Sequence, residues 1–342
     1  MLHETPQPIP EWRDVDATTF HDEVATQYRP AVLRGLVRDW PAVRAAIRSP
    51  AEASRYLVAF DNGSPVDAIL MPPQARGEIF YNDAMDGFNF ARNRLPVSAI
   101  VEQLSRYAMF EDSPSVAVQS ALIPDCLPGF VAENKLPILD EAVAPRLWLG
   151  NRVTVPAHFD ESDNVACVVA GRRRFTLFPP EQVANLYIGP LDYAPTGAAM
   201  SMVRFADPDF EKFPRFREAL SAALVAELEP GDALFIPTLW WHHVESLDRK
   251  FNVLVNYWWN GALGAVGRTA SAMDCLLHGL LNIRPLRPEL RTAWASLFHH
   301  YVFGASDDKH AHIPMHRRGV LANLSPEAAK RVKDLLIARL QR

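Results

Sequence analysis

The sequence predicts a mainly β protein with helices: an antiparallel barrel or jelly roll in the middle of the chain, mixed α/β elements before it and a helical bundle after it. Two observations carry this prediction. Between about 145 and 262, short runs rich in β-branched and aromatic residues are bounded by Gly, Pro or Asp, which is typical of barrel strands. From about 268 onward, apolar residues recur at helical spacing instead. The strand-like runs are RLWLG (146–150), VACVVA (165–170), RFTLF (174–178), DALFI (232–236) and FNVLVNYWW (251–259).

Residues 1–145 have a mixed pattern that precedes the barrel. Apolar spacing predicts helices at 17–28, 41–56 and 96–107, and a strand within PAVLRGLV at 30–37. No group of residues that could carry chemistry stands out here. We therefore expect α/β elements that support the barrel.

One long insertion, at about 181–229, interrupts the strand-like runs. In its second part, FPRFREALSAALVAEL, the residues Phe216, Leu220, Leu224 and Leu228 have helical spacing. We expect a helix there, and we expect the insertion to cover one mouth of the barrel as a lid.

The last 75 or so residues, 268–342, are expected to form a helical bundle. The final helix has a clear start, because Ser325 suits the N-cap and Pro326 the first helical position. Helices with this many apolar faces either pack on the barrel or pair with a second copy, and we expect a homodimer. The expected domains are thus 1–267, with a barrel core at about 145–262, and 268–342.

Composition narrows the class of protein. Of the 342 residues, 49% are hydrophobic and 22% charged, which fits a globular chain, and the net charge of −5 argues against nucleic acid as a partner. Cys126, Cys167 and Cys275 have neither CxxC nor disulfide-framework spacing.

The start, MLHETPQPIPEW, differs from a secretory signal, and no run approaches 18 apolar residues. We expect a cytoplasmic protein without a membrane partner.

The stretch HFDESDN, at 158–164, is the first candidate for chemistry. Residues i and i+2 of a strand point to the same face, so His158 and Asp160 would project together into the barrel. An imidazole and a carboxylate on one face provide two of the three ligands of the facial triad that non-haem Fe(II) oxygenases use. The alternative is a polar patch without a metal.

A third ligand is available in EPGDALFIPTLWWHHVESL, at 229–247, where an apolar strand is followed by His242 and His243. Adjacent residues on a strand face opposite ways, so only one of the two histidines points inward. We expect His242 to complete the site and His243 to have a structural role.

Other histidine clusters favour packing or surface roles. His21 and Glu23 form an H-x-E pair, but they fall in a predicted helix, where i and i+2 diverge. The loop HAHIPMHRRG could bind zinc through its three histidines, but it has no acidic or thiolate partner. These three are His310, His312 and His316. Gly-rich phosphate loops and G-x-S-x-G motifs are absent from the sequence, which argues against nucleotide hydrolysis and serine hydrolase chemistry.

The sequence resembles the cupin-like branch of the JmjC family over roughly residues 10–262. This resemblance implies a double-stranded β-helix in which His158, Asp160 and His242 bind Fe(II), with 2-oxoglutarate as co-substrate. The segments that carry it are RPAVLRGLVRDWPA (29–42), PAHFDESDNVACVVAGRRRFTLFPPEQ (156–182), PGDALFIPTLWWHHVESL (230–247) and NVLVNYWWNG (252–261).

The resemblance also implies roles for residues around the metal. Asn164 and Asn256 are expected to contact 2-oxoglutarate or a metal-bound water, and Trp258 to form a wall of the same pocket, with Trp241 and Phe178 nearby. For Asn256 the alternative is a buried amide that bonds to the backbone.

The co-substrate pocket departs from the family pattern. Where an asparaginyl hydroxylase of this branch has a lysine for the distal carboxylate of 2-oxoglutarate, this chain has Arg173, whose planar fork could form two hydrogen bonds instead of one. Strand alternation places Arg173 inside and its two neighbours outside; the alternative is a solvated arginine run. Two hydroxyl-bearing anchors are replaced by Ala117 and Val155, with Thr154 one residue away.

Three functions remain open at this point. The first is an Fe(II)- and 2-oxoglutarate-dependent oxygenase that hydroxylates a protein side chain or a small molecule. The second is a metal- or ligand-binding cupin-like protein without turnover, which the missing hydroxyl anchors favour. The third is a scaffold that assembles through its helical tail.

Overall fold

The structure is a computed structural model that describes residues 6–259, 272–304 and 310–341. The chain divides into two compact units, Met1–Trp259 and Asn260–Arg342. The domain boundary expected from the sequence, between 267 and 268, lies outside the described residues.

The first unit is a jelly roll made of two sheets, which confirms the predicted fold class. The smaller sheet has five strands in the order β1-β12-β11-β14-β9. These strands are β1 (Gln7–Pro8), β12 (Leu224–Leu228), β11 (Arg173–Phe178), β14 (Trp241–Ser246) and β9 (Thr154–His158).

The larger sheet has ten strands in the order β2-β3-β13-β10-β15-β8-β6-β4-β5, with β7 paired to β8. Its strands are β2 (Glu11–Arg13), β3 (Ala31–Arg34), β13 (Ala233–Ile236), β10 (Asp163–Ala170), β15 (Asn252–Trp259), β8 (Pro145–Gly150), β6 (Ser115–Val118), β4 (Val66–Met71), β5 (Ala91–Leu95) and β7 (Ala121–Leu122). The N-terminal region therefore extends the barrel sheet as well as supporting it.

The two central strands of the larger sheet are buried on both faces. In β10, Ala166 and Val168 face the barrel interior, where they pack with Phe175 and Leu177 of the smaller sheet. The alternate residue Cys167 faces the other way, into a core shared with the helices. Burial on both faces explains why β10 has a continuous apolar run instead of an alternating pattern.

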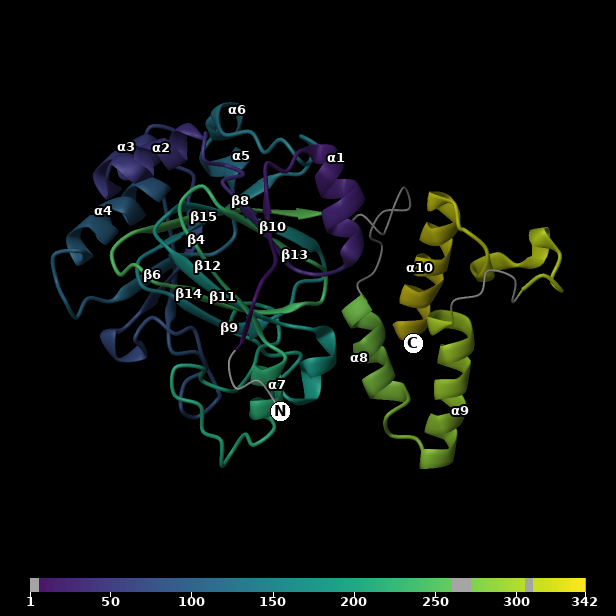
Figure 1. The fold of residues 1–342 in the computed structure, drawn as a ribbon. Coiled ribbons are helices and arrows are strands. Elements are labelled where there is room, and N and C mark those ends of the chain that lie inside the picture. Colours follow the sequence, from purple (N-terminus) through teal and green to yellow (C-terminus); the bar gives the residue numbers. More distant parts are fainter. Residues whose placement is uncertain (1–5, 260–271, 305–309, 342) are drawn as a thin grey trace. The chain divides into compact units, whose positions relative to one another are not determined.

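Helices α2, α3 and α4 lie together on the outer side of the barrel unit (Figure 1). The predicted helix at 41–56 is two helices, because Pro50 lacks a backbone N–H and Ser49 caps the second one by accepting from the backbone N–H of Glu52. The helices of this unit are α1 (Ala17–Thr19), α2 (Pro41–Arg48), α3 (Pro50–Val58), α4 (Val97–Tyr107), α5 (Ile123–Cys126), α6 (Phe130–Glu133) and α7 (Phe216–Ser221). A π-helical turn at Phe20–Val24 follows α1, and 3₁₀ turns lie at Ala25–Gln27, Pro73–Ala75 and Pro180–Ala184.

The helix predicted for the end of the insertion is wrong beyond Ser221, where α7 ends. The strand β12 follows, and it belongs to the smaller sheet. Leu224, Ala226 and Leu228 are buried between the sheets, whereas Glu227 is exposed. A spacing of four residues fits one face of a helix and one face of a strand equally well, which is why Leu224 and Leu228 misled the prediction.

The described part of the second unit is helical, as predicted. Its helices are α8 (Ala272–Asn282), α9 (Pro288–Phe298), a π-helical turn at His299–Phe303 and α10 (Pro326–Leu340), with 3₁₀ turns at Met315–Arg317 and Gly319–Leu321. Ser325 caps α10 by accepting a hydrogen bond from the backbone N–H of Ala328 at 3.3 Å. Every helix in the described residues of the chain is too short or too polar to cross a membrane.

Candidate metal centre

Neighbouring strands of the smaller sheet bring His158, Asp160 and His242 together. β9 and β14 are antiparallel, and His158 is the direct partner of His242 in their register. The two imidazole centroids lie 4.2 Å apart, and Nε2 of His242 lies 3.6 Å from Oδ2 of Asp160. One ligand atom from each residue lies within 4.8 Å of the others, and no other group of this kind occurs in the described residues.

Hydrogen bonds fix both imidazoles in the tautomer that a metal needs. Nδ1 of His158 lies 2.9 Å from the carbonyl oxygen of Pro156, and Nδ1 of His242 lies 3.1 Å from that of Trp240. Because a carbonyl only accepts, each Nδ1 carries the proton and each Nε2 keeps a free lone pair. Burial, aided by the nearby His158, lowers the pKa of His242 to about 4, so this imidazole is neutral at pH 7.

Hydrogen bonds and one ring contact behind the triad orient its carboxylate. The indole N–H of Trp258 donates to Oδ2 of Asp160 at 3.1 Å. Trp258 packs edge-on against Trp148, whose own indole N–H donates to Oδ1 of Asn256 at 2.8 Å. The amide of Asn256 then donates to Oδ1 of Asn164 at 3.1 Å. Asn256 thus bonds to side chains and not to the backbone, contrary to the alternative considered above.

The triad and Arg173 line one cavity of about 380 Å³. The side chains of Arg172 and Arg174 point outward and pair with carboxylates, whereas Arg173 is 8% exposed and faces the cavity, as strand alternation predicts. Its Nε is buried without a hydrogen-bond partner in the described structure. Burial lowers the pKa of Arg173 to about 10, so the guanidinium remains cationic at pH 7.

An unpaired buried cation points to an anionic ligand. A buried charge without a partner is costly, and protein structures seldom keep one without a function. The cavity wall also contains Asn164, Asn256 and Trp258, so the expected metal ligands and the residues expected to bind the co-substrate line one cavity.

The rim of the cavity was not predicted from the sequence. Arg92 forms an ion pair with Asp67, with Nη1 of Arg92 2.7 Å from Oδ2 of Asp67, and its Nη2 donates to the carbonyl oxygen of Pro195 at 2.8 Å. The hydrogen bond to Pro195 connects the insertion to the rim of the cavity. Other lining residues that the sequence analysis missed are Trp148, Phe175, Gln119, Ser120 and Thr196. They come from segments far apart in the sequence, and no local pattern marks them.

Some residues expected near the site lie elsewhere. Trp241 and Phe178 are outside the cavity lining and pack in a separate core with residues of the insertion, because each alternates with an inward-facing neighbour. Ala117 is buried against Ile69, away from the cavity, while Val155 does line it. His243 faces away from the triad and stacks on Phe205 with the ring centroids 4.1 Å apart.

The donor set fits a divalent transition metal. Two imidazole nitrogens and one carboxylate oxygen converge from one side, which is the composition of the 2-His-1-carboxylate triad of non-haem Fe(II) proteins. Fixed tautomers and an oriented carboxylate are the features that metal ligands share in proteins.

Comparisons with known proteins agree with the fold. A family model described as a cupin-like domain matches residues 17–263. JmjC domain-containing protein D of Dictyostelium discoideum is 27% identical over 248 residues, covering 68% of this chain and 52% of that protein. Lysine-specific demethylase 8 of Xenopus tropicalis is 27% identical over 266 residues, covering 74% and 53%. The chain therefore spans about half the length of these two relatives.

A further relative is similar over more of its own length. The human bifunctional peptidase and (3S)-lysyl hydroxylase JMJD7 is 27% identical over 270 residues, which cover 70% of this chain and 80% of that protein. The candidate ligands His158, Asp160 and His242 all lie within the segment that the family model matches.

Proposed function

The chain belongs to the cupin-like JmjC family, and from this premise we propose that it is an Fe(II)- and 2-oxoglutarate-dependent oxygenase that hydroxylates a protein side chain or a small molecule. One observation carries the proposal. Two histidines with fixed tautomers, one carboxylate and an unpaired guanidinium share a single cavity.

His158, Asp160 and His242 would hold the iron. When bound, Fe(II) supplies the oxidation chemistry: one atom of O₂ enters a substrate C–H bond, and the other enters succinate as 2-oxoglutarate loses CO₂. The chain contributes the two imidazoles and the carboxylate that Trp258 orients. Its apolar wall, with Ile236 and Leu254, would keep water away from the reacting atoms.

Arg173 would bind the distal carboxylate of 2-oxoglutarate. The guanidinium is buried and cationic, and a two-point contact with a carboxylate would satisfy both its charge and its donors. The amide nitrogen of Asn164 has no hydrogen bond to the described residues, so it can donate to the same ligand. These two contacts would take the place of the hydroxyl group that the family resemblance expects at the position of Val155.

The test measures succinate and 2-oxoglutarate binding in the same preparation. The Fe(II)-loaded chain should convert 2-oxoglutarate to succinate, and His158→Ala should abolish the conversion, while His21→Ala, which changes an exposed histidine in a π-helical turn, should leave it unchanged. Arg173→Met should weaken 2-oxoglutarate binding about 10- to 100-fold, because a hydrogen-bonded buried charge contributes about 1.5–3 kcal/mol. Arg173→Lys should lower the affinity for 2-oxoglutarate by a smaller factor.

The second candidate is a metal- or ligand-binding protein without turnover. Val155, at a position where the family resemblance expects a hydroxyl, favours it. Metal binding with neither succinate formation nor 2-oxoglutarate binding would select this candidate and reject the oxygenase. If the wild-type chain bound no metal, only the third function, a scaffold, would remain.

A further inference from the structure

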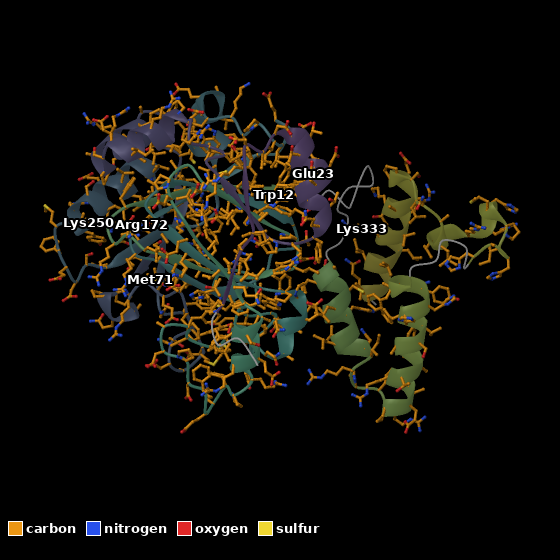
Figure 2. The ribbon with its side chains drawn as sticks, viewed as in Figure 1. Trp12, Glu23, Met71, Arg172, Lys250 and Lys333 are labelled. Atoms are coloured by element: carbon orange, nitrogen blue, oxygen red, sulfur yellow. The ribbon has the colours of Figure 1, made fainter. Side chains whose placement is uncertain are left out.

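A second cavity, of about 540 Å³, lies in the barrel unit and shares no lining residue with the cavity of the metal site. Two turns of the barrel form part of its wall. Arg152 lies in the turn before β9, and Arg249 and Lys250 lie in the turn between β14 and β15. The end of α4 and Arg76 complete the wall, and Lys250 is labelled at this edge of the unit in Figure 2.

Four cationic side chains line this cavity without a partner. In the described structure, Arg76, Arg152, Arg249 and Lys250 form no ion pair, side-chain hydrogen bond or ring contact. Most other Lys and Arg side chains of residues 6–259 do, as Arg172 does with Asp248 in the neighbouring turn. The acidic Glu111 and Asp112 also line the cavity, so four cations and two acids leave an excess of two positive charges.

A serine hydroxyl at the cavity provides an independent observation. Ser115 of β6 is 5% exposed and lines the cavity, yet its hydroxyl has no hydrogen-bond partner in the described structure. The hydroxyl oxygen itself is not completely buried, so it is accessible from the cavity and can donate to a bound ligand. The aromatic side chains of Tyr107 and Phe110 lie at the same cavity, and Phe110 is 64% exposed.

We propose that this cavity binds a small phosphate-bearing anion with more than one phosphate. Guanidinium groups form paired hydrogen bonds with phosphate oxygens, and the excess positive charge favours a multiply charged ligand. The ligand is either a nucleotide, whose base would lie on Tyr107 or Phe110, or a short inorganic polyphosphate. The site is independent of the proposed oxygenase chemistry.

The experiment is calorimetric titration of the full-length, metal-free chain with ATP and, separately, with tripolyphosphate, at low salt without Mg²⁺. We expect binding that the double variant Arg249→Ala/Lys250→Ala weakens at least 10-fold. Arg29→Ala removes an exposed, unpaired arginine outside the cavity and should leave the affinity unchanged. Arg173→Met should also have no effect, because Arg173 lines the other cavity.

The outcomes decide the proposal and the ligand class. Tighter binding of ATP than of tripolyphosphate supports a nucleotide, and equal binding supports the phosphate chain alone. Ser115→Ala should weaken either ligand several-fold if its hydroxyl donates to the phosphate. The proposal is overturned if neither probe binds the wild-type chain, or if the double variant, folded by its circular dichroism spectrum, binds as well as the wild type. Loss of binding in Arg173→Met would place the anion in the metal-site cavity and also overturn it.

Discussion

Trp258 orients a candidate metal ligand through a hydrogen bond, although Trp258 is not itself one of the candidate ligands. Its indole N–H donates to Oδ2 of Asp160, the same oxygen that lies 3.6 Å from Nε2 of His242. Partners of this kind hold a ligand in the direction that the metal requires. Trp258 therefore acts through Asp160, as a positioning residue.

Trp258→Phe should lower the affinity for Fe(II) about 10- to 100-fold, because it removes this hydrogen bond and keeps most of the aromatic contact. Anaerobic titration with Fe(II), or with Mn(II) as a redox-stable probe, measures the change. The matched control is Trp241→Phe, which alters a buried tryptophan that donates to the carbonyl oxygen of Pro180, away from the cavity. Equal metal affinity in both variants would contradict the positioning role.

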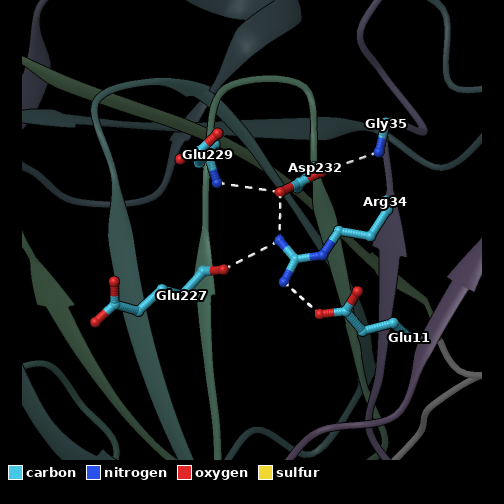
Figure 3. Close-up of polar contacts among 6 residues, drawn as sticks. All are labelled: Glu11, Arg34, Gly35, Glu227, Glu229 and Asp232. Carbon is cyan, nitrogen blue, oxygen red and sulfur yellow. Dashed lines mark hydrogen bonds and ion pairs between the residues drawn. The ribbon is translucent and has the colours of Figure 1, made fainter.

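At the scale of elements, an ion-pair network joins the N-terminal strands to the barrel (Figure 3). Arg34 of β3 bonds through Nη1 to Oδ2 of Asp232 at 2.6 Å and through Nη2 to Oε1 of Glu11 at 2.6 Å. Asp232 also accepts from the backbone N–H groups of Gly35 and Glu229. It thus fixes the turn before β13, and β13 pairs with β10, which carries Asn164.

Asp232→Ala should lower the free energy of unfolding by about 2–4 kcal/mol, because Arg34 then keeps only Glu11 and the carbonyl oxygen of Glu227 as acceptors, and two backbone donors lose theirs. The side chains of Arg34 and Asp232 are only 20% and 12% exposed, so water replaces this carboxylate poorly. Glu11→Ala is the control, and since Glu11 is 45% exposed its loss should cost less than about 1 kcal/mol. Urea denaturation at pH 7 measures both, and similar costs would show that Asp232 has no special part in the network.

The elements and site residues that could be predicted from the sequence are those that follow the two-residue alternation of side chains along a strand. The period of two placed His158 with Asp160, and Arg173 opposite to Arg172, although their roles as metal and co-substrate ligands remain predictions. Helical spacing misled the prediction at β12, because Leu224 and Leu228 fit one face of a helix as well as one face of a strand. The rim residues Asp67 and Arg92 could not be predicted, because their pairing depends on how β4 and β5 are joined in the sheet.

At the scale of the whole molecule, the helical unit exposes large apolar side chains. Ala329, at 9% exposure, is the one buried residue among its described positions. Twelve large apolar side chains on its helices and the π-helical turn are 41% to 74% exposed: Leu276, Leu281, Leu290, Trp294, Leu297, Tyr301, Val302, Phe303, Leu335, Leu336, Ile337 and Leu340. A core this small does not stabilise three helices in water. The exposed apolar faces must therefore pack against another surface.

We propose that the partner is a second copy of the chain, which makes the protein a homodimer through its C-terminal helices. A stable interface buries about 800 Å² on each partner, and twofold symmetric pairing is the commonest way in which identical chains associate. Leu336 and Leu340 lie one helical turn apart on α10, so a pair of charges there would disrupt one apolar face.

Light scattering during size-exclusion chromatography should give twice the chain mass for the wild type at micromolar concentration. Leu336→Glu/Leu340→Glu should shift the mass to that of one chain and leave metal binding unchanged, because the triad lies in the other unit. The control is Ile47→Glu, which places one charge on an exposed apolar position of α2 in the barrel unit and should remain dimeric. A wild-type chain that elutes as a monomer would mean that these helices cover their apolar faces within one chain.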